Sequence, residues 1–421
     1  MSVYALIGGA WALFLGIALM MLGNGLQGTL LGLRATIEHF GTSTTGVVMA
    51  GYYLGFLGGS TLVPRFLARV GHIRVYAALA SLASAAVLLH AVFVDPIAWF
   101  LFRIVTGISY AGLYVVVESW INDRATNRTR GTLLSIYMVI SIGGMAASQL
   151  LLNVADPRGY DLFILSSVLV SVALVPIALS ATRAPDFEAP ERLGPHAIYK
   201  ISPLGVMGCL LTGVAYGGFF GMGAVYASAI GMSVAQVSYF MAMMLIGATL
   251  LQWPIGALSD RFDRRRVITV VTFAAAGFAL LAIPASRFSN TALLMVIFLL
   301  GGTSMPLYSL TLAHTNDFLK PHQMVAASSS LVMVQGIGLS FGPLIAAGLM
   351  DLIGPSGMLV GVAGGHAAIG LFALYRMTQR AARPLDEQRS YTVTPPRTTP
   401  VAVAAALRDN RDRDLARLSS R

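Results

Sequence analysis

Two charged side chains, Arg103 and Glu118, stand inside a stretch that is otherwise uncharged up to Asn122. If this stretch crosses a bilayer, a charge near its centre costs about 2.5–3.5 kcal/mol and needs a partner, a proton or water. Arg103 can bind an anion or assist proton movement, or it can be a structural arginine that snorkels to the membrane surface or bonds backbone carbonyl oxygens. Glu118 can carry a coupling proton, but the favoured interpretation is a gate carboxylate that pairs with Arg69 or Arg130.

Two amides, Asn24 and Gln27, lie about one helical turn apart in another apolar stretch. Buried amides are costly unless they face a polar cavity or bond to another helix, so this pair is a candidate for contact with a polar solute. Groups for metal or covalent chemistry are not clustered: His90, His314 and His366 lie apart, and no phosphate cradle or nucleophile elbow occurs. The sequence therefore predicts no enzyme, no cofactor and no metal site.

The composition of the chain indicates a membrane protein. Of its 421 residues, 56% are hydrophobic and only 11% are charged, whereas soluble domains carry about 25% charged residues. A soluble fold of this size cannot hide so much apolar surface. Backbone groups in lipid must bond to each other, which leaves helices or closed barrels. Barrel strands alternate polar and apolar residues, while the apolar runs here are unbroken, so helices are expected.

Stretches of about 20 mostly apolar residues can each cross the hydrocarbon core as a helix. Twelve such spans are predicted, at 5–33, 45–64, 74–94, 97–122, 131–154, 161–181, 204–230, 234–258, 267–286, 291–316, 324–350 and 356–376. We therefore expect an all-α polytopic membrane protein with an N-terminal six-helix bundle (1–181), a charged, Pro-rich linker (182–203), a C-terminal six-helix bundle (204–377) and a disordered tail (378–421).

The net charge of +10 is distributed unevenly. No basic residue precedes Arg34, which argues against a cleaved signal peptide and for a retained first helix. Most basic residues fall on one side when the spans are threaded alternately, and basic loops stay in the cytoplasm. This predicts a multi-pass protein of a bacterial inner membrane with both termini cytoplasmic. Nucleic-acid binding is the alternative for such charge, but the basic residues lie in short loops between spans, so no nucleic-acid partner is expected.

The two halves of the chain share a sequence pattern. Leu-Tyr, seven residues and Asn-Asp occur twice, 194 residues apart, and two glycines share this offset. The paired positions include Tyr114 and Tyr308, Asp123 and Asp317, Gly107 and Gly301, and Gly144 and Gly338. Duplicated halves around a central binding site are the usual construction of secondary transporters.

The segment from Gly256 to Arg265, Gly-Ala-Leu-Ser-Asp-Arg-Phe-Asp-Arg-Arg, resembles the Gly-x-Leu-x-Asp-Arg-x-Gly-Arg-Arg loop signature of the major facilitator superfamily. One position departs, because Asp263 replaces the second glycine. The matching loop after the second span is more degenerate, with Pro64 and Ala68 where the family has Gly and Asp. The stretches YVVVESW and RGTLLSIYM are similar to the bacterial YcaD-like branch and to related riboflavin-transporter-like proteins.

This resemblance implies two pseudo-symmetric six-helix bundles around a central cavity, working as a monomer by alternating access. The expected substrate-binding residues are Asn24, Gln27, Arg103, Tyr110, Tyr114, Tyr216, Phe220 and Tyr308, and neighbouring spans add Tyr53, Tyr137, Gln149, Trp253 and Gln335. The expected gating or coupling residues are Arg69, Glu118, Arg130, Asp260, Arg261 and Arg264. Aromatic rings suit a planar solute, although for any single ring packing against lipid or another helix is the alternative.

The leading hypothesis is a secondary transporter that carries a small organic solute across the lipid bilayer. It would be driven by an ion gradient, for which protons are the candidate, or by the solute's own gradient. Uptake of a vitamin-like solute such as riboflavin is favoured, and proton-coupled efflux of drugs or sugars is the alternative. The fifth span contains Gly143 and Gly144 but lacks the Gly-x-x-x-Gly-Pro pattern that is common in drug antiporters of the family. A membrane enzyme would need clustered His, Asp or Glu, and a sensor would need a folded soluble domain; the sequence indicates neither.

Overall fold

The computed structural model describes residues 3–126, 129–179, 193–320, 323–385, 388–389, 391 and 399. Within these residues the chain is helical and contains no β-strand. Twelve stretches, from Ala10–Ile37 to Gly357–Gln379, are long and apolar enough to cross a membrane. They agree with the twelve predicted spans to within a few residues at most ends, so the all-α polytopic fold is confirmed.

The first half contains α1 (Val3–Ile37), α2 (Thr42–Val70), α3 (His72–Val92), α4 (Pro96–Arg124), α5 (Arg130–Leu150), the 3-10 turn η1 (Leu151–Asn153) and α6 (Asp161–Ala178). The second half contains α8 (Pro203–Ala229), α9 (Val234–Arg261), α10 (Arg264–Phe288), α11 (Asn290–Ser304), α12 (Pro306–Asn316), α13 (Met324–Ile353) and α14 (Gly357–Gln379). The described part of the linker forms the short helix α7 (Pro195–Ile201). Local sequence sets several boundaries: Asp95 caps α4 ahead of Pro96, and Ser233 forms a capping box with Gln236 at the start of α9.

The tenth predicted span is interrupted near its middle. Pro306 has no backbone N–H to donate to the preceding turn, and α11 accordingly ends at Ser304 while α12 begins at Pro306. The hydroxyl of Tyr216 in α8 donates to the carbonyl oxygens of Ser304 (3.0 Å) and Met305 (2.6 Å). Because polar backbone groups in a bilayer need partners, this side chain makes the break tolerable inside an apolar bundle.

The two halves repeat the same helix pairs. In the first half α2 packs along α4 and α1 along α5, and in the second half α9 packs along α11 and α8 along α13. Glycines allow the closest crossings: a Cβ on Gly55 would overlap the backbone of Ile104, and one on Gly247 would overlap the backbone of Phe298. Small residues of this kind let helix backbones approach within a membrane. The repeated sequence therefore corresponds to a repeated packing, which gives two pseudo-symmetric bundles.

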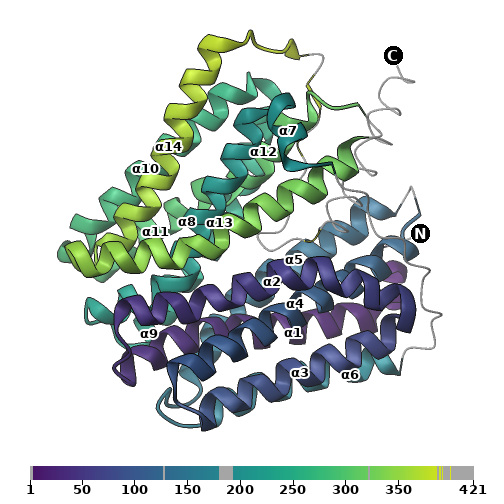
Figure 1. The fold of residues 1–421 in the computed structure, drawn as a ribbon, viewed down its shortest axis with the longest axis vertical. Coiled ribbons are helices and arrows are strands. Elements are labelled where there is room, and N and C mark those ends of the chain that lie inside the picture. The colour runs from purple at the N-terminus through teal and green to yellow at the C-terminus, as the bar shows by residue number, and fades with distance from the viewer. Residues whose placement is uncertain are drawn as a thin grey trace.

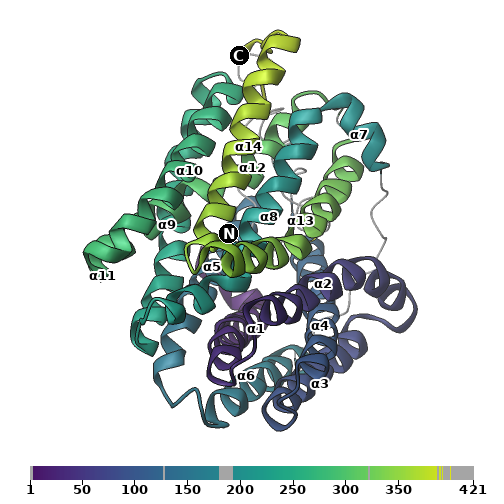
Figure 2. The same ribbon diagram turned by 60° about the vertical axis from the view of Figure 1, so that its left-hand side comes forward.

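Arginines gather where α2 meets α3, where α4 ends and where α9 meets α10: Arg69, Arg74, Arg124, Arg261 and Arg264. We call this end of the molecule the basic end, and the other the opposite end. At the opposite end the bundles touch, with Gly46 of α2 against Ala347 of α13. There Asn153 Nδ2 also donates to the hydroxyl of Ser238 in α9 (3.0 Å). The bundles diverge toward the basic end, on the right of Figure 1. Figure 2 shows α1, α2, α3, α4 and α6 grouped apart from α10, α12 and α14.

Candidate functional site

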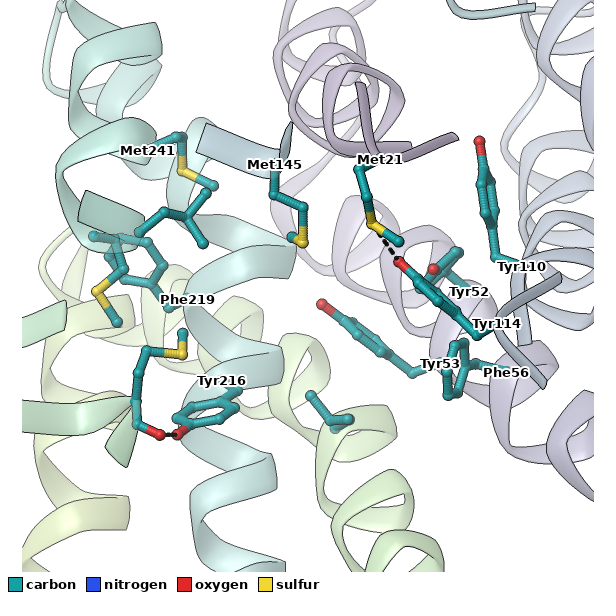
Figure 3. Packing of buried hydrophobic residues seen from close by; sticks show 14 of the residues in the cluster. Met21, Tyr52, Tyr53, Phe56, Tyr110, Tyr114, Met145, Tyr216, Phe219 and Met241 are labelled. Atoms are coloured by element: carbon teal, nitrogen blue, oxygen red, sulfur yellow. Dashed lines mark hydrogen bonds between the residues drawn. The ribbon is translucent and has the colours of Figure 1, made fainter. Parts of the chain in front are cut away.

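A polar cluster lies inside the N-terminal bundle. Nδ2 of Asn24 in α1 donates to the hydroxyl oxygens of Tyr52 in α2 (3.2 Å) and Tyr114 in α4 (3.1 Å). The Tyr114 hydroxyl donates in turn to the sulfur of Met21, as Figure 3 shows. These side chains are buried. Since buried amides and hydroxyls need partners, the bonds join three helices and fix Asn24 beside Tyr114.

Arg103 of α4 points into this cluster. Its guanidinium carbon lies 4.5 Å from the centroid of the Tyr52 ring. The centroid of the Tyr110 ring lies 6.3 Å from that of Tyr52. A cation over an aromatic face is attracted by the ring's quadrupole, more strongly when it is desolvated. With 4% of its surface exposed, Arg103 faces the interior of the bundle. The snorkelling alternative therefore does not describe it.

Several buried polar groups have no hydrogen-bond partner within the part of the chain that the structure describes. They include both amide atoms of Gln27, the hydroxyls of Tyr110 and Tyr308, and Nε2 of Gln335. Gly28 lies on the same face of α1 as Asn24, and a Cβ there would point into open space. A buried polar group without a partner costs about 1–3 kcal/mol. A polar solute or water that bonded to these groups would recover that cost.

The facing wall comes from the C-terminal bundle and is more apolar. Phe219 stacks on Phe240 with ring centroids 5.4 Å apart and meets Phe220 edge to face at 5.6 Å. The hydroxyl of Tyr216 already donates to carbonyl oxygens at the α11–α12 break, so in this structure it is engaged there and not directed at a solute. Figure 3 shows Tyr53 and Met145 of the first bundle between the Tyr114 cluster and this wall. On this side of the bundle interface, the residues Phe219, Phe220, Phe240 and Met241 would therefore present aromatic rings and a thioether to a solute.

Two residues expected to face the cavity have other surroundings. Trp253 is 76% exposed on α9 and belongs to the outer surface, where it can contact lipid. Gln149 accepts a hydrogen bond from the Thr29 hydroxyl (2.6 Å) and so joins α5 to α1. Sequence alone could not separate these faces, because the spans are apolar all round.

Glu118 lies near the basic end of α4 and is 2% exposed. Its Oε1 accepts a hydrogen bond from the hydroxyl of Tyr137 in α5 (2.7 Å), and its Oε2 accepts one from the hydroxyl of Thr399 in the tail. Arg69 is exposed at the end of α2 and forms no ion pair with a described residue. The side chain of Arg130 lies outside the described residues. A pair between Glu118 and Arg69 would belong to another conformation.

Arg264 is the centre of an ion-pair network at the basic end. This side chain is 1% exposed and donates to Asp317 Oδ2 (2.6 Å), Asp260 Oδ1 (3.3 Å) and Ser259 Oγ (3.0 Å). Burial raises the pKa of Asp317, and the positive charge of Arg264 opposes that shift. The structure therefore brings Asp260 and Arg264 together, whereas Arg261 is exposed to solvent.

Three contributors to these sites were not among the sequence candidates. Tyr52 is next to the predicted Tyr53; its hydroxyl accepts a hydrogen bond from Asn24, and Arg103 lies over its ring. Both contacts come from other helices, so the sequence around Tyr52 does not reveal them. Asp317 had a signal, because it belongs to the repeated pattern of the two halves. Tyr391 had none, since its segment has the composition of a disordered tail. Metal-binding chemistry adds nothing further: no group of three or more His, Cys, Asp or Glu that could hold a metal occurs among the described residues.

Twelve spans in two repeated bundles, with a polar aromatic cluster and charged residues at one end, define a membrane transport protein of the secondary type. The sequence profile of the Major Facilitator Superfamily matches residues 13–244 and 205–413. The chain therefore belongs to this superfamily, as the loop signature and the repeat predicted.

Relatives and structures agree with this assignment. The chain is 28% identical to the uncharacterized MFS-type transporter YcaD of Escherichia coli, over 80% of this chain and 87% of that protein, and the match to YcaD of Shigella flexneri has the same extent. A variant of the nucleoside transporter NupG has a TM-score of 0.75 at 12% identity, covering 87% of this chain and 99% of that chain. A bacterial homologue of the human lysosomal transporter Spinster, inward-facing and unoccupied, has a TM-score of 0.67 at 14% identity, covering 96% of each chain. At these identities the two structures show the fold alone.

Proposed function

We propose that this chain takes up a small organic solute with a planar ring and polar substituents, of the vitamin type that riboflavin represents, by alternating access as a monomer. The observation that supports this most is the cluster of Asn24, Tyr52, Tyr110 and Tyr114 beside Arg103, with the unpaired amide of Gln27 one turn away. Rings offer stacking faces, and the amides and hydroxyls offer orientation. A nucleoside, which NupG is named for transporting, has the same combination of planar ring and hydroxyl groups.

The arrangement of the bundles supports an inward-facing state. They touch at the opposite end, where Gly46 meets Ala347, and diverge toward the basic end. Basic loops remain in the cytoplasm, so we place the basic end and both termini on the cytoplasmic side of a bacterial inner membrane. Solute would leave toward the cytoplasm in this state. The next step would exchange the contacts at the opposite end for new ones at the basic end.

Transport into proteoliposomes tests this function. The purified chain is reconstituted, a proton gradient is imposed, and riboflavin, nucleosides, sugars and cationic drugs are offered in turn. We expect accumulation of a planar, hydroxylated solute, and a loss of about tenfold or more in the Arg103→Leu and Asn24→Ala variants. The matched control is Trp253→Ala, whose large ring lies on the outer surface. Accumulation of sugars alone, or equal losses in all three variants, would contradict the proposal.

Proton-coupled efflux of drugs or sugars is the second candidate, and it would use the same buried carboxylate as proton-coupled uptake. Glu118 is a buried carboxylate within α4, where a proton can bind and leave as the chain alternates. The direction of net movement decides between the two. Uptake predicts that the solute enters vesicles together with protons, whereas efflux predicts that it leaves in exchange for them.

A further inference from the structure

The described residues of the C-terminal tail are bonded to the ion-pair network of the C-terminal bundle. The backbone N–H of Arg389 donates to Asp317 Oδ1 (2.9 Å), and its carbonyl oxygen accepts from Nη2 of Arg264 (2.6 Å). The backbone N–H of Tyr391 donates to Asp260 Oδ1 (2.8 Å). Three backbone groups of the tail therefore bond to three side chains of the network. Each bond involves an ionised group, which makes it stronger than a neutral one.

The same tail also reaches the N-terminal bundle. The hydroxyl of Thr399 donates to Oε2 of Glu118, and Thr399 is 0% exposed. Glu118 belongs to α4, in the other bundle from the residues that hold Arg389. The described residues of the tail therefore contact both bundles at the basic end.

The ring of Tyr391 fits against a residue of the family's loop signature. A Cβ built on Gly256 would overlap this ring, and its three nearest atoms all belong to Tyr391. The ring packs on a small apolar cluster of α8, α9, α10, α12 and α14 that includes Ile255 and Leu307. Its hydroxyl is buried close to Gln252, and burial raises the pKa of Tyr391 to about 12. The absence of a side chain at Gly256 thus creates the space that this ring occupies.

The tail is hydrogen-bonded to the carboxylates that are expected to hold the basic end closed. Asp260 and Glu118 are the two carboxylates expected to stabilise that end when it closes, one in each bundle. Both are hydrogen-bonded to the tail in this structure. While Tyr391 and Thr399 occupy these two carboxylates, Asp260 and Glu118 cannot form the contacts that would bring α4 and α9 together. Docking of the tail and closure of the basic end therefore exclude each other.

We propose that the tail, through its described residues Arg389, Tyr391 and Thr399, acts as an autoinhibitory latch, which keeps the basic end open until the tail is released. This inference rests on the proposed alternating-access function. The tail acts here as a ligand of its own chain, and a ligand shifts a two-state equilibrium by the difference in its affinity for the two states. A latch therefore needs only that the tail bind the open state more tightly than the closed one. Docked on one state alone, the tail slows the cycle in proportion to the time it stays bound. Release increases turnover without any change at the Asn24 cluster.

Distance measurement between spin labels tests the latch without reference to a solute. Cysteines are introduced at the exposed positions Ala68 and Arg266 of the full-length chain, with Cys209 replaced by Ser, and the protein is placed in lipid nanodiscs. Tyr391→Ala should shift the population toward the shorter distance of a closed basic end, by about tenfold in the ratio of the two states. Tyr391→Phe keeps the ring and should resemble the parent. The matched control in the tail is Leu385→Ala, whose side chain is 53% exposed.

Gly256→Ala gives a second, independent route to the same release. Its methyl group would occupy the position of the Tyr391 ring, so it should produce the same shift as Tyr391→Ala. In the double variant the two effects should not add, because the second change removes a contact that is already lost. Where a transported solute is known, both single variants should also increase its exchange rate about three- to tenfold.

The outcomes separate the latch from the function beneath it. An unchanged distance distribution in both Tyr391→Ala and Gly256→Ala would overturn the latch, whatever the chain transports. Additive effects in the double variant, or unfolding in Tyr391→Ala that Tyr391→Phe does not share, would show that the ring supports the fold instead. A population shift without transport of any tested solute would leave the latch standing and count against the proposed function.

Discussion

The two bundles share a scaffold but carry their charges at different depths. In the N-terminal bundle, Arg103 and Glu118 lie inside α4, and the residues 194 positions later are Ile297 and Leu312. In the C-terminal bundle the buried charges among the described residues are Arg264, Arg265 and Asp317, at or just beyond the ends of the spans at the basic end. The counterpart of Asp317 in the first half is Asp123, which is exposed.

The comparison distinguishes features that both halves need for folding from features that only one half has. The pairing of helices and the glycine crossings are common to both halves, so they belong to the scaffold. Charges inside the membrane are costly and stay only where a cluster such as that of Tyr52 and Asn24 surrounds them. Charges at the basic end cost less and can bond to a tail. We therefore propose that the first bundle binds the solute and that the second controls the basic end.

The largest effect should come from breaking the shared scaffold. Gly107→Ala and Gly301→Ala each place a methyl group on a facing backbone, of Tyr52 and Met244 respectively. Overpacking of this kind costs about 1–3 kcal/mol or more, and backbone atoms cannot move aside. Both variants should lose most folded protein, measured as monodisperse yield in detergent. Gly58→Ala, where a Cβ meets open space, should be tolerated. Tolerance of Gly301→Ala alone would show that the halves pack differently.

A smaller but still large effect should separate the two aspartates of the repeated pattern. Asp317→Asn leaves Arg264 buried without its closest carboxylate, and breaking one partner of a buried pair costs about 3–5 kcal/mol. Asp123→Asn changes an exposed side chain and should have almost no effect. Thermal unfolding in detergent measures both. If the two variants melted together, the ion-pair network would not be the structural centre of the basic end.

Much of this architecture follows from the sequence, because a bilayer leaves few alternatives to an apolar helix of about 20 residues. The spans, the repeat and the family signature were therefore readable. The positions of individual side chains were not, since an all-apolar span does not reveal which face meets lipid; Trp253 is the example. Tyr52 acquires its role from contacts with α1 and α4, which no local pattern encodes. The partner of the carbonyl groups freed at the Pro306 break is Tyr216, which lies far away in the sequence.

Arg103 should matter for transport more than for stability. Arg103→Leu makes the first bundle resemble the second at this depth, where Ile297 stands. The apolar side chain removes a buried charge, so the folded protein should persist while uptake falls by about tenfold or more. Arg103→Lys keeps the charge without the planar stacking on Tyr52 and should retain intermediate activity. Uptake by Arg103→Leu at the parental rate would move the solute site away from this cluster.

The smallest effect is expected at Glu118, and it decides between gate and proton site. As a gate residue, Glu118 stabilises one conformation through Tyr137 and the tail, so Glu118→Gln shifts an equilibrium and leaves the driving ion in place. Accumulation under an imposed proton gradient should then persist at a reduced rate. As the proton site, Glu118 would be the group that titrates, and its amide could not. Counterflow exchange without accumulation at any proton gradient would make Glu118 the coupling residue and give the first bundle both tasks.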